Sequence, residues 1–243
     1  MLDIKLYSEL LDVVDTPHAQ ACCFATLSSA EKQRAESFVL ERHRRRYILA
    51  HGLLRAALSS FEPEVEPADW CFAANRYGRP FVATRAIPRP IHFSLSHTEG
   101  CVACVVTRCE SVGVDVEVIQ RRPSIIATVG RSFSPQEIAI LRTLRLPARI
   151  DRFFEYWTLK EAYVKARGMG LSLPLNQFSI LISSNHNIRI TFAPSVSDDP
   201  QRWRFTLKSP SPRHKLAIAD GSGLPGGLPI VVQPSPLHKG TSG

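Results

Sequence analysis

The first half of the chain changes from helical to strand-like spacing of its apolar residues. Between positions 44 and 59 apolar side chains recur every three or four residues, which predicts an amphipathic helix. This stripe consists of Ile48, Leu49, Leu53, Leu54, Ala57 and Leu58. Upstream, Ser28 and Glu31 have capping-box spacing, which marks the start of an earlier helix. Apolar runs at 91–95, 101–107 and 112–119 then predict strands.

The second half repeats this order of helices followed by strands. Ser134-Pro-Gln-Glu137 combines a capping Ser, a Pro at the first helical position and a Glu three residues after the cap, so a helix is expected to start there. A second helix is predicted from about 148 to 167, with Gly168 as the residue that ends it. Strand-like runs follow at 178–182, 187–192, 202–207 and 215–219.

Two halves that each run from helices to strands predict an α+β chain of two similar lobes. The length of 243 residues agrees with one or two domains. We expect an N-terminal lobe at 1–120 and a C-terminal lobe at 121–220. The halves share no repeat that can be aligned, so the duplication is a prediction about shape.

The last part of the chain, 221–243, has a different composition. Ten of its 23 positions are Gly or Pro, which argues against a compact element. It contains Gly221-Ser-Gly-Leu-Pro-Gly226, a formal GxGxxG match, but Pro225 and Gly227 prevent the helix that a dinucleotide-binding motif requires. We therefore predict a flexible Gly/Pro-rich tail.

Composition narrows the class of protein. Hydrophobic residues make up 44% and charged residues 21%, which is ordinary for a soluble globular protein. No run of 18 or more apolar residues occurs, so no membrane span is predicted. The first eleven residues carry Asp3, Lys5 and Glu9 in place of the apolar core of a secretory signal, and a cytoplasmic location is therefore expected.

The cysteines do not form a metal-binding pattern. Cys101 and Cys104 make the only CxxC, and they lie in a strand-like run where residues three apart point to opposite faces. No second CxxC or paired His completes a zinc site. Buried free thiols are expected, because without a secretion signal disulfides are not.

The net charge of +8 is concentrated at Arg42, Arg44, Arg45 and Arg46. Such a run is compatible with a solvated helix face, and also with attraction to phosphates or to an acidic protein. Zinc-finger, RNP and basic-zipper signatures are absent, so a nucleic acid partner is not expected.

Two carboxylates lie close together in Gly113-Val-Asp-Val-Glu117. Alternation along a strand puts Asp115 and Glu117 on one face and Val114 and Val116 on the other. One interpretation is an exposed strand face. The other is a Mg²⁺ site, because hard cations take oxygen ligands and Mg²⁺ uses few carboxylates together with phosphates.

A second group of polar residues lies on the helix predicted at 148–167. Trp157, Glu161 and Lys165 are spaced one turn apart along one face. An ordinary Glu161–Lys165 ion pair explains this spacing, while the tight turn at Gly168-Met-Gly170 is also suited to a site that handles phosphate. Phe93-Ser-Leu-Ser-His97 ends a strand near a loop, and no GxSxG motif supports a hydrolase triad.

Five motifs in this order resemble the Sfp-type 4′-phosphopantetheinyl transferases, in the subgroup with Trp and Lys-Glu-Ala. They are Asn75-Arg-Tyr-Gly-Arg-Pro80, Phe93-Ser-Leu-Ser-His97, Gly113-Val-Asp-Val-Glu117, Phe133-Ser-Pro-Gln-Glu137 and Trp157-Thr-Leu-Lys-Glu-Ala-Tyr-Val-Lys165. The similarity covers about 28–182 and continues more loosely to about 219. Five collinear motifs are specific because chance matches multiply down. The family fold is a pseudo-dimer of two α+β lobes with the active site between them.

The resemblance also implies an activity: transfer of 4′-phosphopantetheine from coenzyme A to a serine of an acyl or peptidyl carrier protein, with release of 3′,5′-ADP. This is the activity of a holo-acyl-carrier-protein synthase. Mg²⁺ is the implied cofactor, with Mn²⁺ as a possible substitute, and coenzyme A is a substrate. An acidic carrier domain is the implied partner, and a monomer is expected because one chain supplies both sides of the site.

Residue roles follow from the same resemblance. Asp115, Glu117 and Glu161 match the three metal-binding carboxylates, and Glu161 also matches the general base, acting directly or through water. The residues that match coenzyme A contacts are Arg34, Arg46, Arg79, Ser96, His97, Asp115, Lys160 and Lys165. Lys165 is also expected to act in catalysis by neutralising charge on the phosphate.

Arg79 departs from the family pattern, because many relatives have Lys there and a planar guanidinium replaces a point charge. Two other classes remain to be compared with the transferase. A non-catalytic module could hold an acidic protein or nucleic acid on its basic surface. A hydrolase could cleave pyrophosphates at the same metal site. The sequence does not identify the carrier protein or its pathway.

Overall fold

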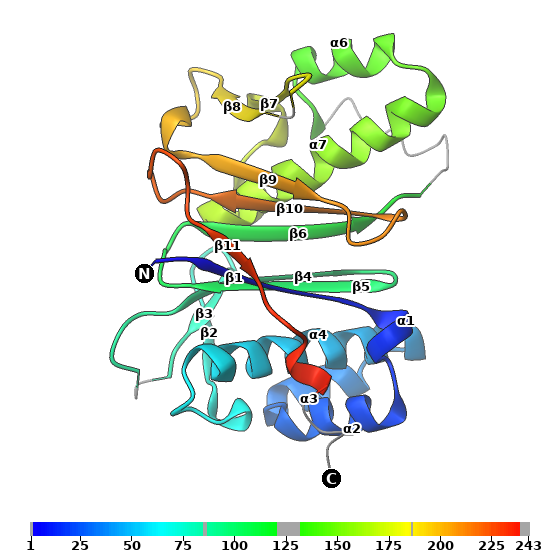
Figure 1. Ribbon diagram of the computed structural model, residues 1–243, viewed down its shortest axis with the longest axis vertical. Helices are drawn as coiled ribbons and strands as arrows, with labels where there is room; N and C mark the ends of the chain where they lie inside the picture. The colour runs from blue at the N-terminus through cyan, green and yellow to red at the C-terminus, as the bar shows by residue number, and fades with distance from the viewer. Residues whose placement is uncertain (1, 85–86, 121–131, 186, 239–243) are drawn as a thin grey trace.

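The computed structural model has four layers, in the order helices, sheet, sheet, helices (Figure 1). It describes residues 2–84, 87–120, 132–185 and 187–238. Each lobe packs one long helix on the outer face of its own sheet, and the inner faces of the two sheets meet in the middle. The predicted α+β architecture of two similar lobes is confirmed.

The N-terminal lobe is built on a mixed sheet with strand order β11-β1-β5-β4. Its elements are β1 (Ile4–Leu10), α1 (Leu11–Val14), α2 (Pro17–Thr26), α3 (Ser29–Glu36), α4 (Glu41–Phe61), η1 (Pro67–Asp69), β2 (Phe72–Ala74), β3 (Pro80–Val82), β4 (His92–Thr98) and β5 (Cys101–Thr107). The predicted helix at 44–59 lies within α4, and the capping box of Ser28 and Glu31 is formed. The apolar stripe of α4 packs against β4 and β5.

The C-terminal lobe contains a three-stranded antiparallel sheet of order β6-β10-β9 and a separate β7–β8 hairpin. Its elements are β6 (Val112–Val118), α6 (Pro135–Thr143), α7 (Leu146–Arg167), η3 (Gly170–Ser172), η4 (Leu175–Gln177), β7 (Phe178–Ile182), β8 (Ile188–Phe192), η5 (Pro200–Arg202), β9 (Arg204–Lys208) and β10 (His214–Asp220). Gly168 ends α7 with a positive φ of 64°, as its predicted role requires.

The lobe boundary predicted at residue 120 is wrong, because β6 belongs to the second sheet. Its backbone pairs with β10 from Val118 opposite His214 to Val112 opposite Asp220. The boundary therefore falls in the short connection between Thr107 and Val112. Alternation of apolar residues predicts the strand, but it carries no information on which neighbour accepts its hydrogen bonds.

The flexible tail predicted at 221–243 is also wrong for the part that the structure describes. β11 (Ile230–Val232) crosses back and pairs in parallel with β1, opposite Ile4, Lys5 and Leu6. Leu228 is buried in the core between the sheets, and a turn of helix, η6 (Pro236–His238), lies against α4. Residues 239–243 lie outside the described part of the chain.

The strand β5 is buried on both faces. Cys101, Ala103 and Val105 point into the core between the two sheets, while Val102, Cys104 and Val106 pack under α4. Cys101 and Cys104 are buried free thiols on opposite faces, as predicted. Within the described segments, no helix has the length and apolar character needed to cross a membrane.

Candidate active site

Three cavities follow one another along β4 in the cleft between the lobes. The apolar cavity, of about 410 Å³, lies between Phe93–Leu95 of β4 and α7. The carboxylate cavity, of about 360 Å³, lies beside Ser96 and His97. The charged cavity, of about 640 Å³, lies beyond them at the β4–β5 turn, against the start of α4.

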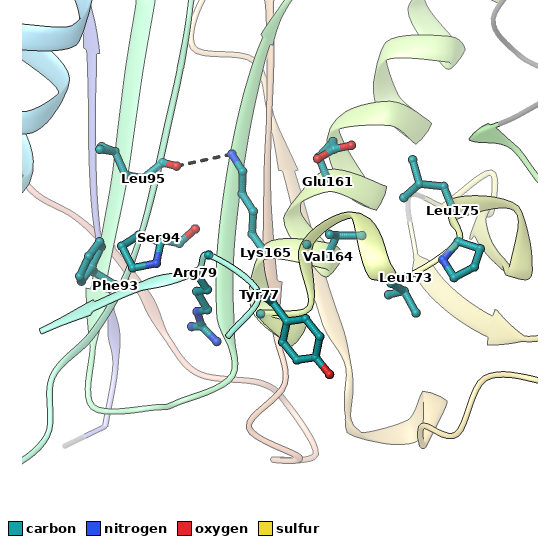
Figure 2. A pocket seen from close by; sticks show the side chains of 15 residues that line it. Tyr77, Arg79, Phe93, Ser94, Leu95, Glu161, Val164, Lys165, Leu173 and Leu175 are labelled. Carbon is teal, nitrogen blue, oxygen red and sulfur yellow. Dashed lines mark hydrogen bonds between the residues drawn. The ribbon is translucent and has the colours of Figure 1, made fainter. Parts of the chain in front are cut away.

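Glu161 and Lys165 line both the apolar and the carboxylate cavity. Figure 2 shows both side chains projecting from α7, with Lys165 reaching across to the carbonyl oxygen of Leu95. They lie one turn apart on the helix, as their spacing predicted.

The close approach of α7 to β6 brings these residues together with the strand carboxylates. Gly113 makes this approach possible: a Cβ at this position would lie 2.0 Å from the carbonyl oxygen of Ala162 and 2.6 Å from the backbone nitrogen of Ala166. Both contacts are with helix backbone, which cannot rotate away. The glycine of Gly113-Val-Asp-Val-Glu117 is thus required by packing.

Asp115 is the buried centre of the carboxylate cavity, with 4% of its surface exposed. Its Oδ1 accepts hydrogen bonds from Lys165 Nζ at 2.7 Å and from Ser96 Oγ at 2.8 Å. Its Oδ2 is buried and has no hydrogen-bond partner. A buried carboxylate oxygen without a partner is costly, so this atom is a candidate ligand for a cation.

Glu117 faces the same cavity from β6. Trp157 Nε1 donates to Glu117 Oε1 at 3.1 Å, and Thr98 Oγ1 lies 3.5 Å from Glu117 Oε2. Burial and then the negative charge of Asp115 raise the pKa of Glu117 to about 7. The prediction that Asp115 and Glu117 share one face of a strand is confirmed by the cavity that they both line.

Glu161 completes the group from the helix side. Burial and the charge of Asp115 also raise its pKa, against the opposing effect of Lys165. Three carboxylates that raise one another's pKa need either protons or a cation to offset their charge. In the described part of the chain, however, no three His, Cys, Asp or Glu side chains are already gathered as a metal site.

His97 marks the positive side of the cavity. Burial within the surrounding protein and then the positive charges of Arg46, His51 and Lys165 lower the pKa of His97 to about 4, although the side chain stays accessible to solvent. Arg46 Nε is buried without a hydrogen-bond partner. Cations that lower a histidine pKa in this way would favour an anion placed between them.

Three hydroxyls of β4 connect the two lobes; we call them the hydroxyl seam. Ser94, Ser96 and Thr98 accept hydrogen bonds from successive alternate backbone N–H groups of β6, those of Val114, Val116 and Val118, at 3.0, 3.2 and 3.2 Å. All three are buried. Side-chain oxygens thus take the place that carbonyl oxygens have in a ladder between strands.

The structure corrects the role predicted for Lys160. Its side chain is fully buried and points into the C-terminal lobe, where it pairs with Glu137 at 2.8 Å. Its Nζ also donates to the carbonyl oxygens of Leu175 and Phe178. An ammonium held in this way does not reach a phosphate in the cleft, so Lys160 is a structural residue.

Arg79 lines the apolar cavity but its guanidinium is already bound to backbone. It donates to the carbonyl oxygens of Ala166, Glu110 and Val112. Together with Asn75, whose Nδ2 donates to the carbonyl oxygen of Gly168 at 3.0 Å, it fixes the 75–80 turn to the end of α7. This geometry supports a link between the lobes and not the predicted phosphate contact.

Arg34 is not part of the cluster. It is exposed on α3, with its guanidinium 5.2 Å from the centre of the Phe38 ring, and it lines none of the three cavities. Of the predicted site residues, the structure thus gathers Asp115, Glu117, Glu161 and Lys165 around one cavity, with the others named in the same lining: Ser96 and His97.

Sequence reasoning assigned no role to the side chains that hold the carboxylates. Trp157 was noted only for its helical spacing, yet it binds Glu117. Ser94 and Thr98 were not identified as lobe contacts. Their signal was a hydroxyl at every second position of β4, a period-2 pattern that indicates one strand face.

Comparisons with known proteins were made with this geometry in hand. The family model described as "4'-phosphopantetheinyl transferase superfamily" matches residues 111–219, from β6 to β10. The 4'-phosphopantetheinyl transferase HetI of Nostoc sp. is 33% identical over 185 residues, which are 76% of this chain and 77% of that protein. A 4'-phosphopantetheinyl transferase of Bacillus subtilis is 27% identical over 187 residues, 77% of this chain and 80% of that protein.

Among solved structures, a holo-(acyl-carrier-protein) synthase from Bacillus anthracis aligns with 45% of this chain and 93% of its own. The TM-score of that alignment is 0.37, at 16% identity.

Proposed function

The chain belongs to the 4′-phosphopantetheinyl transferase superfamily, and from this we propose that it moves 4′-phosphopantetheine from coenzyme A to a serine of a carrier protein, with Mg²⁺ and with release of 3′,5′-ADP. It is an enzyme of the transferase class. The metal, the released nucleotide and the roles of individual residues are the parts proposed here.

The observation that carries the proposal is the unpartnered Oδ2 of Asp115. It is buried in the cavity that Glu117 and Glu161 also line, while Lys165 and Ser96 hold the other oxygen. Such a set of oxygen donors fits Mg²⁺, which prefers carboxylates combined with phosphates. We propose Asp115, Glu117 and Glu161 as its protein ligands. When bound, the ion would neutralise charge on the pyrophosphate oxygens.

The positive groups around the cavity would hold the phosphates of coenzyme A. Lys165 lies 2.7 Å from Asp115 and borders both inner cavities, so its ammonium can reach an oxygen at the reacting phosphorus. Arg46 and His97 lie on the opposite side, and we assign to them the phosphate of the nucleotide. The apolar cavity beyond Lys165 offers space for an uncharged part of coenzyme A.

Glu161 is our candidate for the general base. Its pKa is raised by burial and by Asp115, which brings it closer to a working pH and makes the carboxylate a better proton acceptor. The serine hydroxyl would lose its proton to Glu161, directly or through water. A bond then forms between the serine oxygen and phosphorus while the bond from phosphorus to 3′,5′-ADP breaks.

The partner would be an acidic carrier domain. The chain carries a net charge of +8, and four of its arginines lie between Arg42 and Arg46 at the start of α4. A field of this sign would speed the approach of an acidic protein at low salt. Because both lobes contribute to one cleft, we propose that a monomer is active.

The decisive experiment is intact mass spectrometry of an apo carrier protein after incubation with the protein, coenzyme A and Mg²⁺, with EDTA as control. We expect a gain of one phosphopantetheine group per carrier that disappears with EDTA. No gain across fatty-acid, polyketide and peptide-synthetase carriers would contradict the transferase. Release of 3′,5′-ADP without any carrier would indicate a hydrolase instead.

Glu161→Gln tests the assignment of the base. The amide keeps the shape but accepts no proton, so kcat should fall by about 10²- to 10⁴-fold. Arg152→Gln, at the opposite end of α7 and paired with Glu155, serves as the control for a changed charge on the helix. A Glu161→Gln protein with unchanged kcat would remove this residue from the proton transfer.

A further inference from the structure

Ser96 occupies a position in the cleft where the family resemblance implies a direct contact with coenzyme A. The structure gives its hydroxyl two other partners. Its oxygen accepts from the backbone N–H of Val116 at 3.2 Å, and the hydroxyl donates to Asp115 Oδ1 at 2.8 Å. The residue is 6% exposed.

The direction of these two hydrogen bonds is fixed by chemistry. A backbone N–H can only donate, so the Ser96 oxygen must accept from Val116. A serine hydroxyl has a single hydrogen, and an ionised carboxylate can only accept, so that hydrogen is committed to Asp115. Ser96 therefore has no donor left for a phosphate oxygen of coenzyme A.

The consequence for Asp115 is a fixed rotation of its carboxylate. Ser96 from β4 and Lys165 from α7 both bind Oδ1, at 2.8 and 2.7 Å. Oδ2 is thereby left buried and without a partner. Two donors from two different elements on one oxygen determine which oxygen stays free.

We infer that Ser96 is a positioning residue, which turns the free oxygen of Asp115 toward the metal by binding the other oxygen, and does not itself contact coenzyme A. The inference rests on the proposed function for the metal, and it concerns a link across the lobe boundary. It assigns to the hydroxyl seam a second task beyond joining β4 to β6: the strand contact and the orientation of Asp115 share one hydroxyl.

The seam supplies a matched control two residues away. Ser94 also accepts from a β6 backbone N–H, that of Val114 at 3.0 Å, and is also buried, but it has no hydrogen bond to a carboxylate among the described residues. Ser94→Ala and Ser96→Ala thus lose the same kind of strand contact. Only the second also loses a donor to Asp115.

Thr98 supplies the design of a rescue variant. It makes the corresponding contact with Val118 at 3.2 Å, so a threonine hydroxyl fits this seam. Ser96→Thr retains the hydroxyl, whereas Ser96→Ala removes it.

The test measures coenzyme A binding by calorimetry with Mg²⁺ and with EDTA, alongside thermal denaturation. We expect the wild-type protein to bind more tightly with Mg²⁺, and Ser96→Ala to lose that gain by about 10-fold or more, the usual effect of removing a group that orients a metal ligand. Ser94→Ala should keep the gain while its melting temperature falls by a similar amount. Ser96→Thr should restore the gain.

Opposite outcomes would overturn the inference. If Ser96→Ala weakens coenzyme A binding equally with Mg²⁺ and with EDTA, Ser96 is a direct contact. If Ser94→Ala loses the Mg²⁺ gain to the same extent, the effect belongs to the seam as a whole. A wild-type protein whose coenzyme A binding ignores Mg²⁺ would remove the metal and this role with it. Failure of the proposed transfer reaction differs from all of these, because it would appear as binding without modification of any carrier.

Discussion

At the scale of single residues, Lys160 and Lys165 show how two lysines of one helix acquire opposite roles. Lys165 reaches into the cleft, whereas Lys160 is buried against Glu137. Burial lowers the pKa of Lys160 to about 8, against the opposing effect of Glu137. The stability of the lobe therefore depends on this pair.

Lys160→Met should destabilise the protein by about 3–5 kcal/mol, because it leaves the Glu137 carboxylate buried without its cation. The KM for coenzyme A should not change at temperatures where the variant is folded. Urea denaturation and steady-state kinetics measure the two quantities. Adding Glu137→Gln should recover part of the stability. An unchanged stability with a raised KM would restore the phosphate role.

Glu31 is the second residue whose contacts predict a measurable property. Burial would raise its pKa, but hydrogen bonds from His51, the Ser28 backbone N–H and Arg55 outweigh burial and lower the pKa from 4.5 to about 2. A carboxyl with a lowered folded-state pKa adds stability above its unfolded pKa and loses it as pH falls through the folded pKa.

The wild-type protein should therefore lose up to about 3 kcal/mol of stability from this group between pH 5 and pH 2. Glu31→Gln should lack this loss, so the difference in unfolding free energy between the two proteins narrows over that range. Glu36→Gln, exposed on the same helix, is the control. A gap that stays constant with pH would show that these contacts do not act on the charged form.

At the scale of elements, the active site depends on the spacing between β6 and α7. Gly113 sets this spacing because any Cβ there would clash with the backbone of Ala162 and Ala166. Asp115 lies two residues further along the strand, so a shift of the helix would move Lys165 away from it.

Gly113→Ala should cost about 1–3 kcal/mol through overpacking and lower kcat/KM by about 10²-fold through misplacement of the helix residues. Gly226→Ala is a suitable control, since a Cβ there meets nothing within 4 Å. Thermal denaturation and transfer kinetics would be measured for both. Equal, small effects of the two substitutions would show that the helix adapts without cost.

At the scale of the whole molecule, the last strand returns to the first lobe. β11 adds a parallel strand beside β1, Gln233 donates to the carbonyl oxygen of Leu6, and Leu228 fills part of the core between the sheets. The C-terminal segment thus completes the N-terminal sheet.

A chain that ends at Gly227 should be less stable by on the order of 3 kcal/mol, from about 1 kcal/mol for each lost hydrogen bond and the lost burial of Leu228. A chain that ends at His238 retains β11 and η6 and is the control for truncation. Unfolding free energies of the three proteins would be compared. Equal stability of the Gly227 chain and the full chain would show that β11 adds nothing to the fold.

The sequence by itself determined the elements and part of the site. Helical periodicity predicted α4 and α7, capping boxes predicted the starts of α3 and α6, and Gly168 predicted the end of α7. The strand alternation of Asp115 and Glu117 and the four-residue spacing of Glu161 and Lys165 are local geometry, and both survive in the carboxylate cavity. Local geometry can be predicted because the chain's own backbone fixes which side chains share a face.

Only the tertiary structure decided which surface each face meets. Lys160 was assigned to the cleft through a motif, but it precedes Glu161 by one position and so points to a different side of α7, where Glu137 covers it. β6 read as a strand in either lobe until its pairing with β10 was seen, and β11 had too short an apolar run to predict a partner. Periodicity states which residues face together, whereas the partner of a face depends on contacts between segments far apart in the chain.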